Sequence, residues 1–263
     1  MKQKLTIVKV GGAVVEDETQ LFLLLKDFNA ISGPKVLVHG GGRRATKLAE
    51  RLGIETHMVE GRRITDEPML EVVTMVYGGL VNKNVVARLQ ALGANAIGLT
   101  GADAGIIRSE KRPPVCMPSS QAMVDFGFVG DVRQVDAQAL SRLIEAGMLP
   151  VIAPLTHDGA GHLLNTNADT MASETAKALA QLYDVTLVFA FEKPGVLSNP
   201  DDDASVIATI THDDFLRYRA DGTISGGMVP KIENALAAVN AGVSRIVITS
   251  AKAIDGNHGT LIY

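Results

Sequence analysis

Two short apolar runs near the start of the chain each end in glycines and lead into a stretch with helical spacing of its apolar residues. The first is LTIVKV (5–10) before Gly11 and Gly12, and the second is KVLVH (35–39) before three glycines at 40–42. Val/Ile-rich runs that end in glycine and precede a helix are typical of βα units on a buried parallel sheet. The repeated pattern predicts an α/β fold.

The same alternation continues along the chain. Further strand-like runs are NAIGL (95–99), LPVIAPL (149–155), VTLVFAF (185–191) and SRIVIT (244–249). Helices are expected at about 18–30, 43–52, 66–91, 136–146, 168–182, 211–218 and 229–241, with Asp136 and Thr211 placed as N-caps. The segment 104–135, rich in Gly, Pro and charge, predicts β-hairpins, and SNPDDDASV (198–206) predicts an exposed loop. We expect a domain boundary near residue 182.

Composition excludes several classes of protein. A chain of 263 residues with 46% hydrophobic residues and no apolar run of membrane-spanning length is expected to be a soluble globular protein of one large or two modest domains. Its net charge of −4 argues against general nucleic-acid binding. The single Cys116 excludes an intrachain disulfide framework, and the first residues do not resemble a secretory signal, so we expect a cytoplasmic protein. The histidines show no metal-ligand spacing, and no structural metal is expected.

Both amino-terminal glycine clusters are candidate anion sites. KVGGA (9–13) combines a lysine with glycines that let backbone amides approach a phosphate, and HGGGRR (39–44) lies where a helix begins. The alternative is that Gly11 and Gly12 only turn the chain and that Lys9 lies at an exposed strand end. HGGG also occurs in some α/β-hydrolases, but the G-x-S-x-G element, the Walker P-loop and G-x-G-x-x-G are all missing.

Three later motifs carry polar side chains at predicted helix starts. EGRRITD (60–66) could direct one arginine to a carboxylate, although the residues alone favour two solvated arginines before an N-cap at Asp66. NTNAD (165–169) could bind polar substrate groups or could simply cap a helix. SGGMVPKIENAL (225–236) places Lys231 in a first helical turn, where the helix dipole favours anions and a bound phosphate would explain a lysine.

Together, KVGGA, HGGG, RRITD, NTNAD and GGMVPKIENAL resemble the amino acid kinase family in order and spacing, over essentially the whole chain. The resemblance implies a three-layer α/β/α open sandwich with a mainly parallel central sheet and β-hairpin excursions. It also implies an N-terminal lobe (1–182) that binds an N-acylated acidic amino acid and dimerises, and a C-terminal lobe (183–263) that binds ATP with Mg²⁺. The reaction implied is phosphorylation of the side-chain carboxylate of N-acetyl-L-glutamate in arginine biosynthesis.

The resemblance also implies a role for each matching residue. Lys9 and Lys231 would contact the transferring phosphoryl group, and Asp169 would hold both lysines. The residues implied in substrate binding are Gly41, Gly42, Arg63, Asn165 and, more weakly, Asn167. Those implied in phosphate or nucleotide binding are Gly11, Gly12, Gly195 and Ser225. A glutamate carboxylate is already ionised at neutral pH, so such a site needs no catalytic His or Cys.

The chain departs from the family pattern in two places. It has FEKPGVL (191–197) where the family usually has T-D-V-x-G-V-L, and TGADAG (100–105) lacks a lysine often seen there. Arginine-inhibited members carry an extra N-terminal helix, whereas the first strand here begins by about residue 4, so we expect an unregulated homodimer. A kinase for N-succinylglutamate or N-acyl-aminoadipate, or a non-catalytic ligand sensor of the same fold, remains an alternative.

Overall fold

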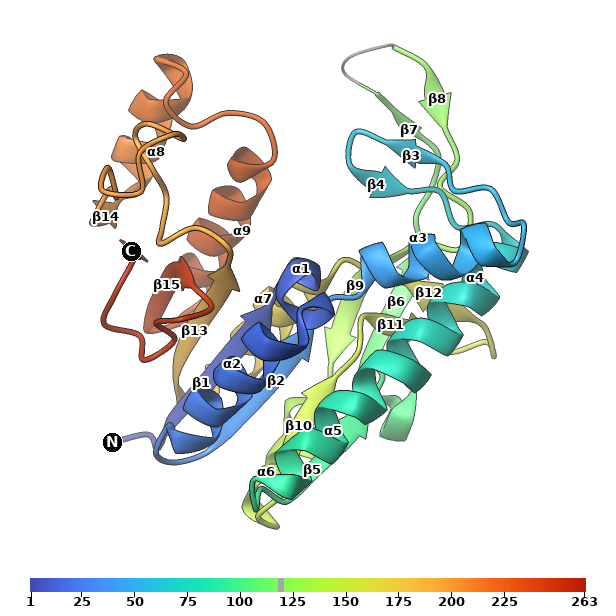
Figure 1. The fold of residues 1–263 in the computed structure, drawn as a ribbon, viewed down its shortest axis with the longest axis horizontal. Coiled ribbons are helices and arrows are strands. Elements are labelled where there is room, and N and C mark those ends of the chain that lie inside the picture. The colour runs from blue at the N-terminus through green and yellow to red at the C-terminus, as the bar shows by residue number, and fades with distance from the viewer. Residues whose placement is uncertain (118–120) are drawn as a thin grey trace.

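The computed structural model describes residues 1–117 and 121–263, and its centre is a sheet of eight strands (Figure 1). The strands lie in the order β14-β16-β15-β13-β1-β2-β10-β5, and each neighbouring pair is parallel except β15 with β16. Their bounds are β1 Lys4–Val10, β2 Lys35–His39, β5 Ala96–Leu99, β10 Leu149–Ile152, β13 Asp184–Phe191, β14 Thr209–Ile210, β15 Arg245–Ser250 and β16 Thr260–Ile262.

Helices cover both faces of this sheet. One face carries α1 (Gly12–Glu16), α2 (Glu18–Ala30), α3 (Gly42–Arg51), α4 (Glu67–Val73), the π-helix η1 (Thr74–Val81) and α5 (Asn82–Ala91). The other face carries α6 (Ala137–Glu145), α7 (Ala168–Leu179), α8 (His212–Ala220) and α9 (Met228–Asn240). Alternate residues of β1 enter opposite cores, Ile7 beside α7 and α9 and Val8 beside α2 and α3. This arrangement confirms the predicted three-layer α/β/α fold.

Smaller sheets project from one end of the main sheet. A four-stranded sheet in the order β12-β11-β6-β9 contains β6 (Ile107–Lys111), β9 (Gly130–Val135), β11 (Leu155–His157) and β12 (Leu163–Asn165), with the 3₁₀ turn η2 (Asp103–Gly105) before β6. Two hairpins, β3–β4 (Met58–Val59, Arg62–Arg63) and β7–β8 (Val115–Cys116, Met123–Val124), extend side by side above α3 (Figure 1). The hairpins predicted at 104–135 are therefore confirmed, apart from 118–120, which lie outside the described residues.

Two elements that were predicted to be continuous, one helix and one strand, are each divided in the structure. The single helix expected at 66–91 is divided by η1, which packs against Leu155 and Thr100: a Cβ added at Gly78 would lie at ordinary contact distances, 3.4 Å and 3.5 Å, from their side chains. The strand expected at 149–155 divides after Ile152, because Pro154 has no N–H for a sheet ladder and β11 joins the second sheet.

The predicted helix caps are present. The side chains of Asp66, Asp136 and Thr211 accept hydrogen bonds from the backbone nitrogens of Met69, Ala139 and Asp214 respectively. The boundary expected near residue 182 falls between α7 and β13, within a sheet made continuous by the pairing of β13 with β1. Among the described residues, no helix is long and apolar enough to cross a membrane.

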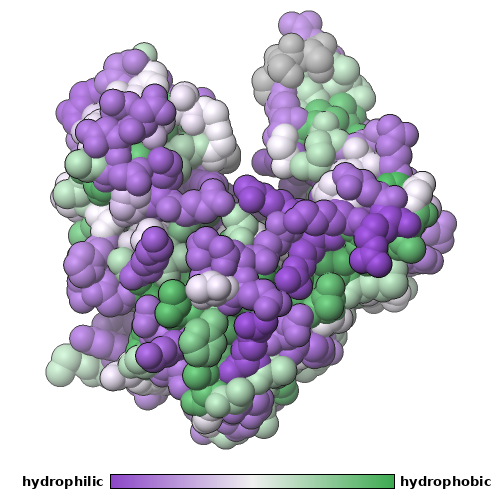
Figure 2. All heavy atoms as spheres, in the orientation of Figure 1, coloured by the Kyte–Doolittle hydropathy of each residue, from purple (hydrophilic) through white to green (hydrophobic). Residues whose placement is uncertain are grey.

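The molecular surface is hollowed between two projecting parts, as Figure 2 shows. On one side stand α8 and the outer part of α9, and on the other stand the two hairpins (Figure 1). We call this hollow the cleft. The carboxyl ends of β1, β2 and β13 point towards it, as expected for ligand sites on open α/β sheets.

Candidate active site

Lys9 and Asp169 form a buried ion pair at the base of the cleft. Lys9, near the end of β1, is 6% exposed, and its Nζ lies 2.7 Å from Oδ1 of Asp169. Asp169 lies in the first turn of α7, whose N-cap is Asn167. An ammonium among apolar strand residues requires a partner, and α7 supplies one because it packs on the face of β1 that Lys9 shares with Leu5 and Ile7. The alternative of an exposed Lys9 is excluded.

The two amino-terminal glycine loops contact each other. A Cβ on Gly12 would lie 3.6 Å from the nitrogen of Gly41, and one on Gly40 would lie 3.1 Å from the nitrogen of Gly12. A Cβ on Gly41 would lie 2.9 Å from the ring of Tyr77. Because a side chain at Gly40 would press on the first loop and one at Gly41 would displace Tyr77, glycine at these two positions lets the backbone amides of both loops lie close together.

A buried histidine orients the second loop. His39 is fully buried, its Nδ1 lies 2.9 Å from the carbonyl oxygen of Gly40, and its Nε2 lies 3.1 Å from Nδ2 of Asn82. The carbonyl can only accept, so Nδ1 carries the proton, and Nε2 accepts from the Asn82 amide, which also donates to Val151 O at 2.9 Å. Burial lowers the pKa of His39 to about 4, which keeps the ring neutral. Since a trans peptide directs N–H opposite to C=O, this bond turns the N–H of Gly41 away from the ring.

Arg63 lies at the end of β4 beside the second loop. Its Nη2 donates to the carbonyl oxygen of Gly42 at 2.9 Å and to Oγ1 of Thr46 at 2.8 Å, and its Nη1 donates to Oγ1 of Thr56 at 3.3 Å. No carboxylate of the described residues lies within ion-pair distance of this guanidinium. Arg63 also contacts Tyr77, whose pKa is raised by burial.

A cavity of about 630 Å³ opens beside Arg63. Its volume lies within the range usual for small-molecule sites, roughly 300–1,000 Å³. It is lined by Gly42, Arg43, Thr46, Glu50, Ile54, Glu55, Thr56, Met58 and Arg63. The structure thus brings to one cavity the second glycine loop and a guanidinium that has no ion-pair partner among the described residues, although the carboxylates of Glu50 and Glu55 also line it. The guanidinium is therefore a candidate for binding a carboxylate of a ligand.

The two asparagines of NTNAD have different surroundings. Asn165, the last residue of β12, is 9% exposed and donates from Nδ2 to Oγ1 of Thr65 at 2.9 Å. Asn167 is engaged in capping α7: its Oδ1 accepts from the nitrogens of Asp169 and Thr170 at 2.8 and 3.0 Å. The capping interpretation therefore holds for Asn167, whose amide nitrogen alone is left for another role.

Lys231 and Lys9 both contact the aromatic ring of Phe191. It lies in the first turn of α9, and its Nζ lies 3.9 Å from the ring centroid of Phe191, while Nζ of Lys9 lies 4.9 Å from the same centroid. Burial lowers the pKa of Lys231, nearby Lys9 lowers it further, and the carboxylates of Asp169 and Glu192 oppose both effects. Lys9, Asp169 and Lys231 thus lie close together, but among the described residues Asp169 is at ion-pair distance from Lys9 alone. The expectation that Asp169 holds both lysines is therefore met only for Lys9.

The remaining predicted residues lie around this centre at different depths. Gly11, at the end of β1, donates from its nitrogen to the carbonyl oxygen of Ala190 at 3.1 Å. Gly195 is buried, and a Cβ there would lie 2.8 Å from Val206 Cγ1 and 2.9 Å from Thr260 Oγ1. Ser225 is exposed before α9. In the part of the chain that the structure describes, no hydrogen bond, ion pair or ring contact joins Gly195 or Ser225 to the two lysines.

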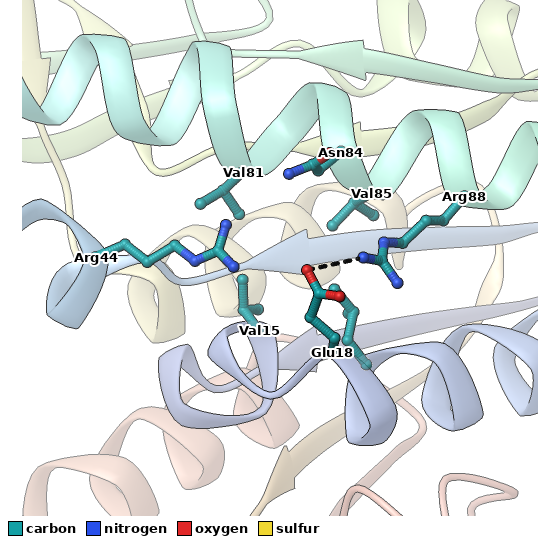
Figure 3. A pocket seen from close by; sticks show the side chains of 8 residues that line it. Val15, Glu18, Arg44, Val81, Asn84, Val85 and Arg88 are labelled. Atoms are coloured by element: carbon teal, nitrogen blue, oxygen red, sulfur yellow. Dashed lines mark ion pairs between the residues drawn. The ribbon is translucent and has the colours of Figure 1, made fainter.

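A second cavity, lined by α1, α2, α3 and α5, is too small for a substrate (Figure 3). Its volume is about 10 Å³, which is at most room for one water molecule. Arg44 and Arg88 extend towards Glu18 there, and Arg88 pairs with Glu18 at 3.4 Å.

Sequence reasoning missed three residues of the site: Tyr77, Asn82 and the ring of Phe191. Tyr77 and Asn82 lie in a long helical run with no local signal. Phe191 had one: it follows Phe189 by two residues in VTLVFAF, and alternate residues of a strand share a face. The pairing of Phe189 with Lys9, which would have located the ring, becomes visible only in the folded sheet.

Comparison with known proteins gives consistent matches along the chain. The model of the amino acid kinase family matches residues 4–250. The acetylglutamate kinase of Bacteroides thetaiotaomicron is 63% identical over 262 residues, covering 100% of this chain and 99% of that protein. The acetylglutamate kinase of Parabacteroides distasonis is 59% identical over 261 residues, covering 99% of this chain and 100% of that protein. A crystal structure of a Streptococcus mutans protein has a TM-score of 0.77 at 28% identity and covers 98% of each chain.

Proposed function

The chain belongs to the amino acid kinase family, and from this premise we propose that it transfers the γ-phosphoryl group of ATP to the side-chain carboxylate of N-acetyl-L-glutamate. The product is N-acetyl-L-glutamyl 5-phosphate, an intermediate of arginine biosynthesis. The observation that carries the proposal is the convergence of Lys9, Asp169, Lys231 and two glycine loops beside a cavity that contains Arg63. The full-length similarity to acetylglutamate kinases supports this choice of substrate.

The reaction requires alignment and charge stabilisation rather than proton transfer. A glutamate carboxylate has an ordinary pKa of about 4.3 and is ionised at neutral pH, so one of its oxygens attacks the γ-phosphorus directly. The new O–P bond forms as the bond to the ADP oxygen breaks, and ADP leaves with that electron pair. Lys9 and Lys231 offset the repulsion between carboxylate and polyphosphate from two sides, and Asp169 holds Lys9 in place.

The substrate binds on the side of the cleft formed by β2, α3 and β4. Arg63 grips its α-carboxylate, since the guanidinium faces the cavity without a carboxylate partner. The amides of Gly41 and Gly42 bind the reacting carboxylate, and Asn165 binds a polar group near the α-carbon. Asn167 contributes at most through its amide nitrogen, because its oxygen caps α7.

MgATP binds on the opposite side. Gly12 offers its amide to the phosphates, whereas the amide of Gly11 already donates to the carbonyl oxygen of Ala190, so Gly11 contributes only by close approach of its backbone. The nucleoside lies near Gly195 and Ser225. Mg²⁺ arrives as part of the MgATP substrate, and a hard cation of this kind is commonly held by phosphate oxygens and water with few protein ligands. Apart from the first glycine loop at the phosphates, this division assigns residues 1–182 to the acyl amino acid and residues 183–263 to ATP.

We further propose that the protein is a cytoplasmic homodimer whose contacts come from residues 1–182. Strand β5 lies at one edge of the main sheet, and the neighbouring π-helix exposes about half of the surfaces of Met75 and Leu80, at 50% and 51%. Light scattering on the purified protein tests this assembly, and a monomeric mass contradicts it.

The test of the reaction is trapping of the acyl phosphate by hydroxylamine in the presence of MgATP. The substrate panel comprises N-acetylglutamate, N-succinylglutamate, N-acetyl-aminoadipate, glutamate and aspartate. We expect hydroxamate with N-acetylglutamate at the highest kcat/KM. If no member of the panel gives hydroxamate, the kinase proposal is excluded. If another member gives a higher kcat/KM than N-acetylglutamate, that member is the preferred substrate.

A further inference from the structure

Phe191 contacts both lysines of the phosphoryl site. It is the last residue of β13, and its ring centroid lies 3.9 Å from Nζ of Lys231 and 4.9 Å from Nζ of Lys9. Its ring also stacks on that of Phe189, with centroids 6.2 Å apart and planes 7° from parallel. Both ammonium distances are within the roughly 6 Å over which a cation is attracted to an aromatic face.

The register of the sheet explains this position. Phe189 pairs with Lys9 between β13 and β1, so Phe191, two residues further, lies on the same face just beyond Lys9. Helices α7 and α9 pack together, and they bring Asp169 to Lys9 and Lys231 to the ring.

Two ammonium groups meet here, and only Lys9 has a carboxylate at ion-pair distance among the described residues. Lys9 is paired with Asp169 at 2.7 Å, whereas Lys231 has the ring as its short-range partner. Like charges this close repel each other, and a Lys231 displaced into the cleft would not be aligned for phosphoryl transfer. The electron-rich ring face offers attraction to a cation without adding a negative charge that would repel ATP.

We propose that Phe191 is a positioning residue whose ring face holds the ammonium groups of Lys9 and Lys231 at the phosphoryl site through cation–π attraction. This inference rests on the proposed roles of the two lysines. It assigns to an apolar side chain the function that a second carboxylate would otherwise have.

Graded fluorination tests the proposal, because fluorine weakens the negative face of a ring with little change in its shape. Phenylalanine carrying one, two or three fluorines is incorporated at position 191 by nonsense suppression, and the same series is incorporated at position 189. Phe189 is the matched control: the stacking of the two rings responds to fluorine on either one, but no cation–ring contact of the described residues involves Phe189.

At position 191 we expect kcat to fall steadily with each fluorine, by roughly two- to thirtyfold over the series, while KM for the acyl amino acid changes little. At position 189 we expect no such trend. Urea unfolding of the same proteins without substrate gives a second readout, and only the 191 series should lose stability stepwise. Phe191→Tyr, which keeps the ring face, should retain activity that Phe191→Leu loses.

A flat series at position 191, or equal slopes at the two positions, overturns the proposal. Failure of the Phe191 proposal can be distinguished from failure of the proposed kinase function. A wild-type protein that forms no hydroxamate refutes the kinase assignment, whereas the unfolding series still decides whether the ring binds the lysines.

Discussion

The two sides of the cleft differ in how deeply their polar side chains are buried. On the side of the acyl amino acid, Lys9, His39 and Asn165 are buried and each contacts a defined partner. On the side of the nucleotide, Ser225 is exposed, and Lys193 is exposed and pairs with the likewise exposed Asp203 at 2.9 Å. If the two sides bind as proposed, the difference in burial predicts a preformed substrate site facing a nucleotide site that gains order when ATP binds. Preorganised groups are the ones that can stabilise charge without reorganising during the reaction.

The largest effect should come from the two lysines, which belong to opposite sides. Lys9→Met and Lys231→Met each remove a charge from the phosphoryl group, and we expect kcat to fall by about 100- to 1,000-fold in both, measured by hydroxamate formation. Only Lys9→Met also leaves Asp169 buried without its partner, so its free energy of unfolding should fall by ~3 kcal/mol in urea titration. Equal stabilities of the two variants would contradict the contrast between the sides.

The buried histidine of the preformed side should make stability depend on pH. The pKa of His39 is lowered from 6.5 to about 4, so the unfolded chain takes up a proton first as the pH falls. Its contribution to stability is complete above pH 6.5 and is lost as the pH falls towards 4, and the full loss is about 3 kcal/mol. Urea unfolding at about pH 7 and about pH 4.5 measures most of this loss.

His39→Gln is the control for that experiment, because it removes the titrating group. The variant should lose most of the slope between these pH values while remaining folded at neutral pH. An unchanged slope would assign the pH dependence to other groups. The carboxylates with lowered pKa, such as Asp158 at about 2, titrate below this window.

Substitution of Arg63 should change the KM of one substrate only. Arg63→Lys loses the planar fork that matches a carboxylate, and we expect KM for N-acetylglutamate to rise by about 10- to 100-fold, with KM for ATP unchanged. The matched control is Arg62→Lys on the same strand, because Arg62 is exposed and lines no part of the cavity. Steady-state kinetics with each substrate varied in turn measures both constants. A parallel rise in KM for ATP would show that the two sides are not independent.

The extent to which sequence predicted this molecule follows from the range of the interactions involved. The βα units and the helix caps at Asp66, Asp136 and Thr211 depend on neighbouring residues and were predicted correctly. The π-helix and the sheet change after Ile152 depend on packing between distant segments and were missed. The same holds within the site: Lys9 and Asp169 were expected together, but the contacts of Phe191 depend on the register of β13 against β1.

The smallest effect should come from the one ion pair that, among the described residues, links the two sides directly. Nη1 of Arg43, in the first turn of α3, lies 3.8 Å from Oε1 of Glu192, which follows β13, and the side chains are 64% and 60% exposed. Water and salt screen such a pair, so a double-mutant cycle of Arg43→Gln and Glu192→Gln should give a coupling energy below about 0.5 kcal/mol in urea unfolding. The coupling should shrink further between about 0.05 M and about 0.5 M salt, because the Debye length shortens. A coupling energy well above about 1 kcal/mol would mean that the substrate side and the nucleotide side are already coupled in the free protein. The nucleotide site would then be as preformed as the site of the acyl amino acid.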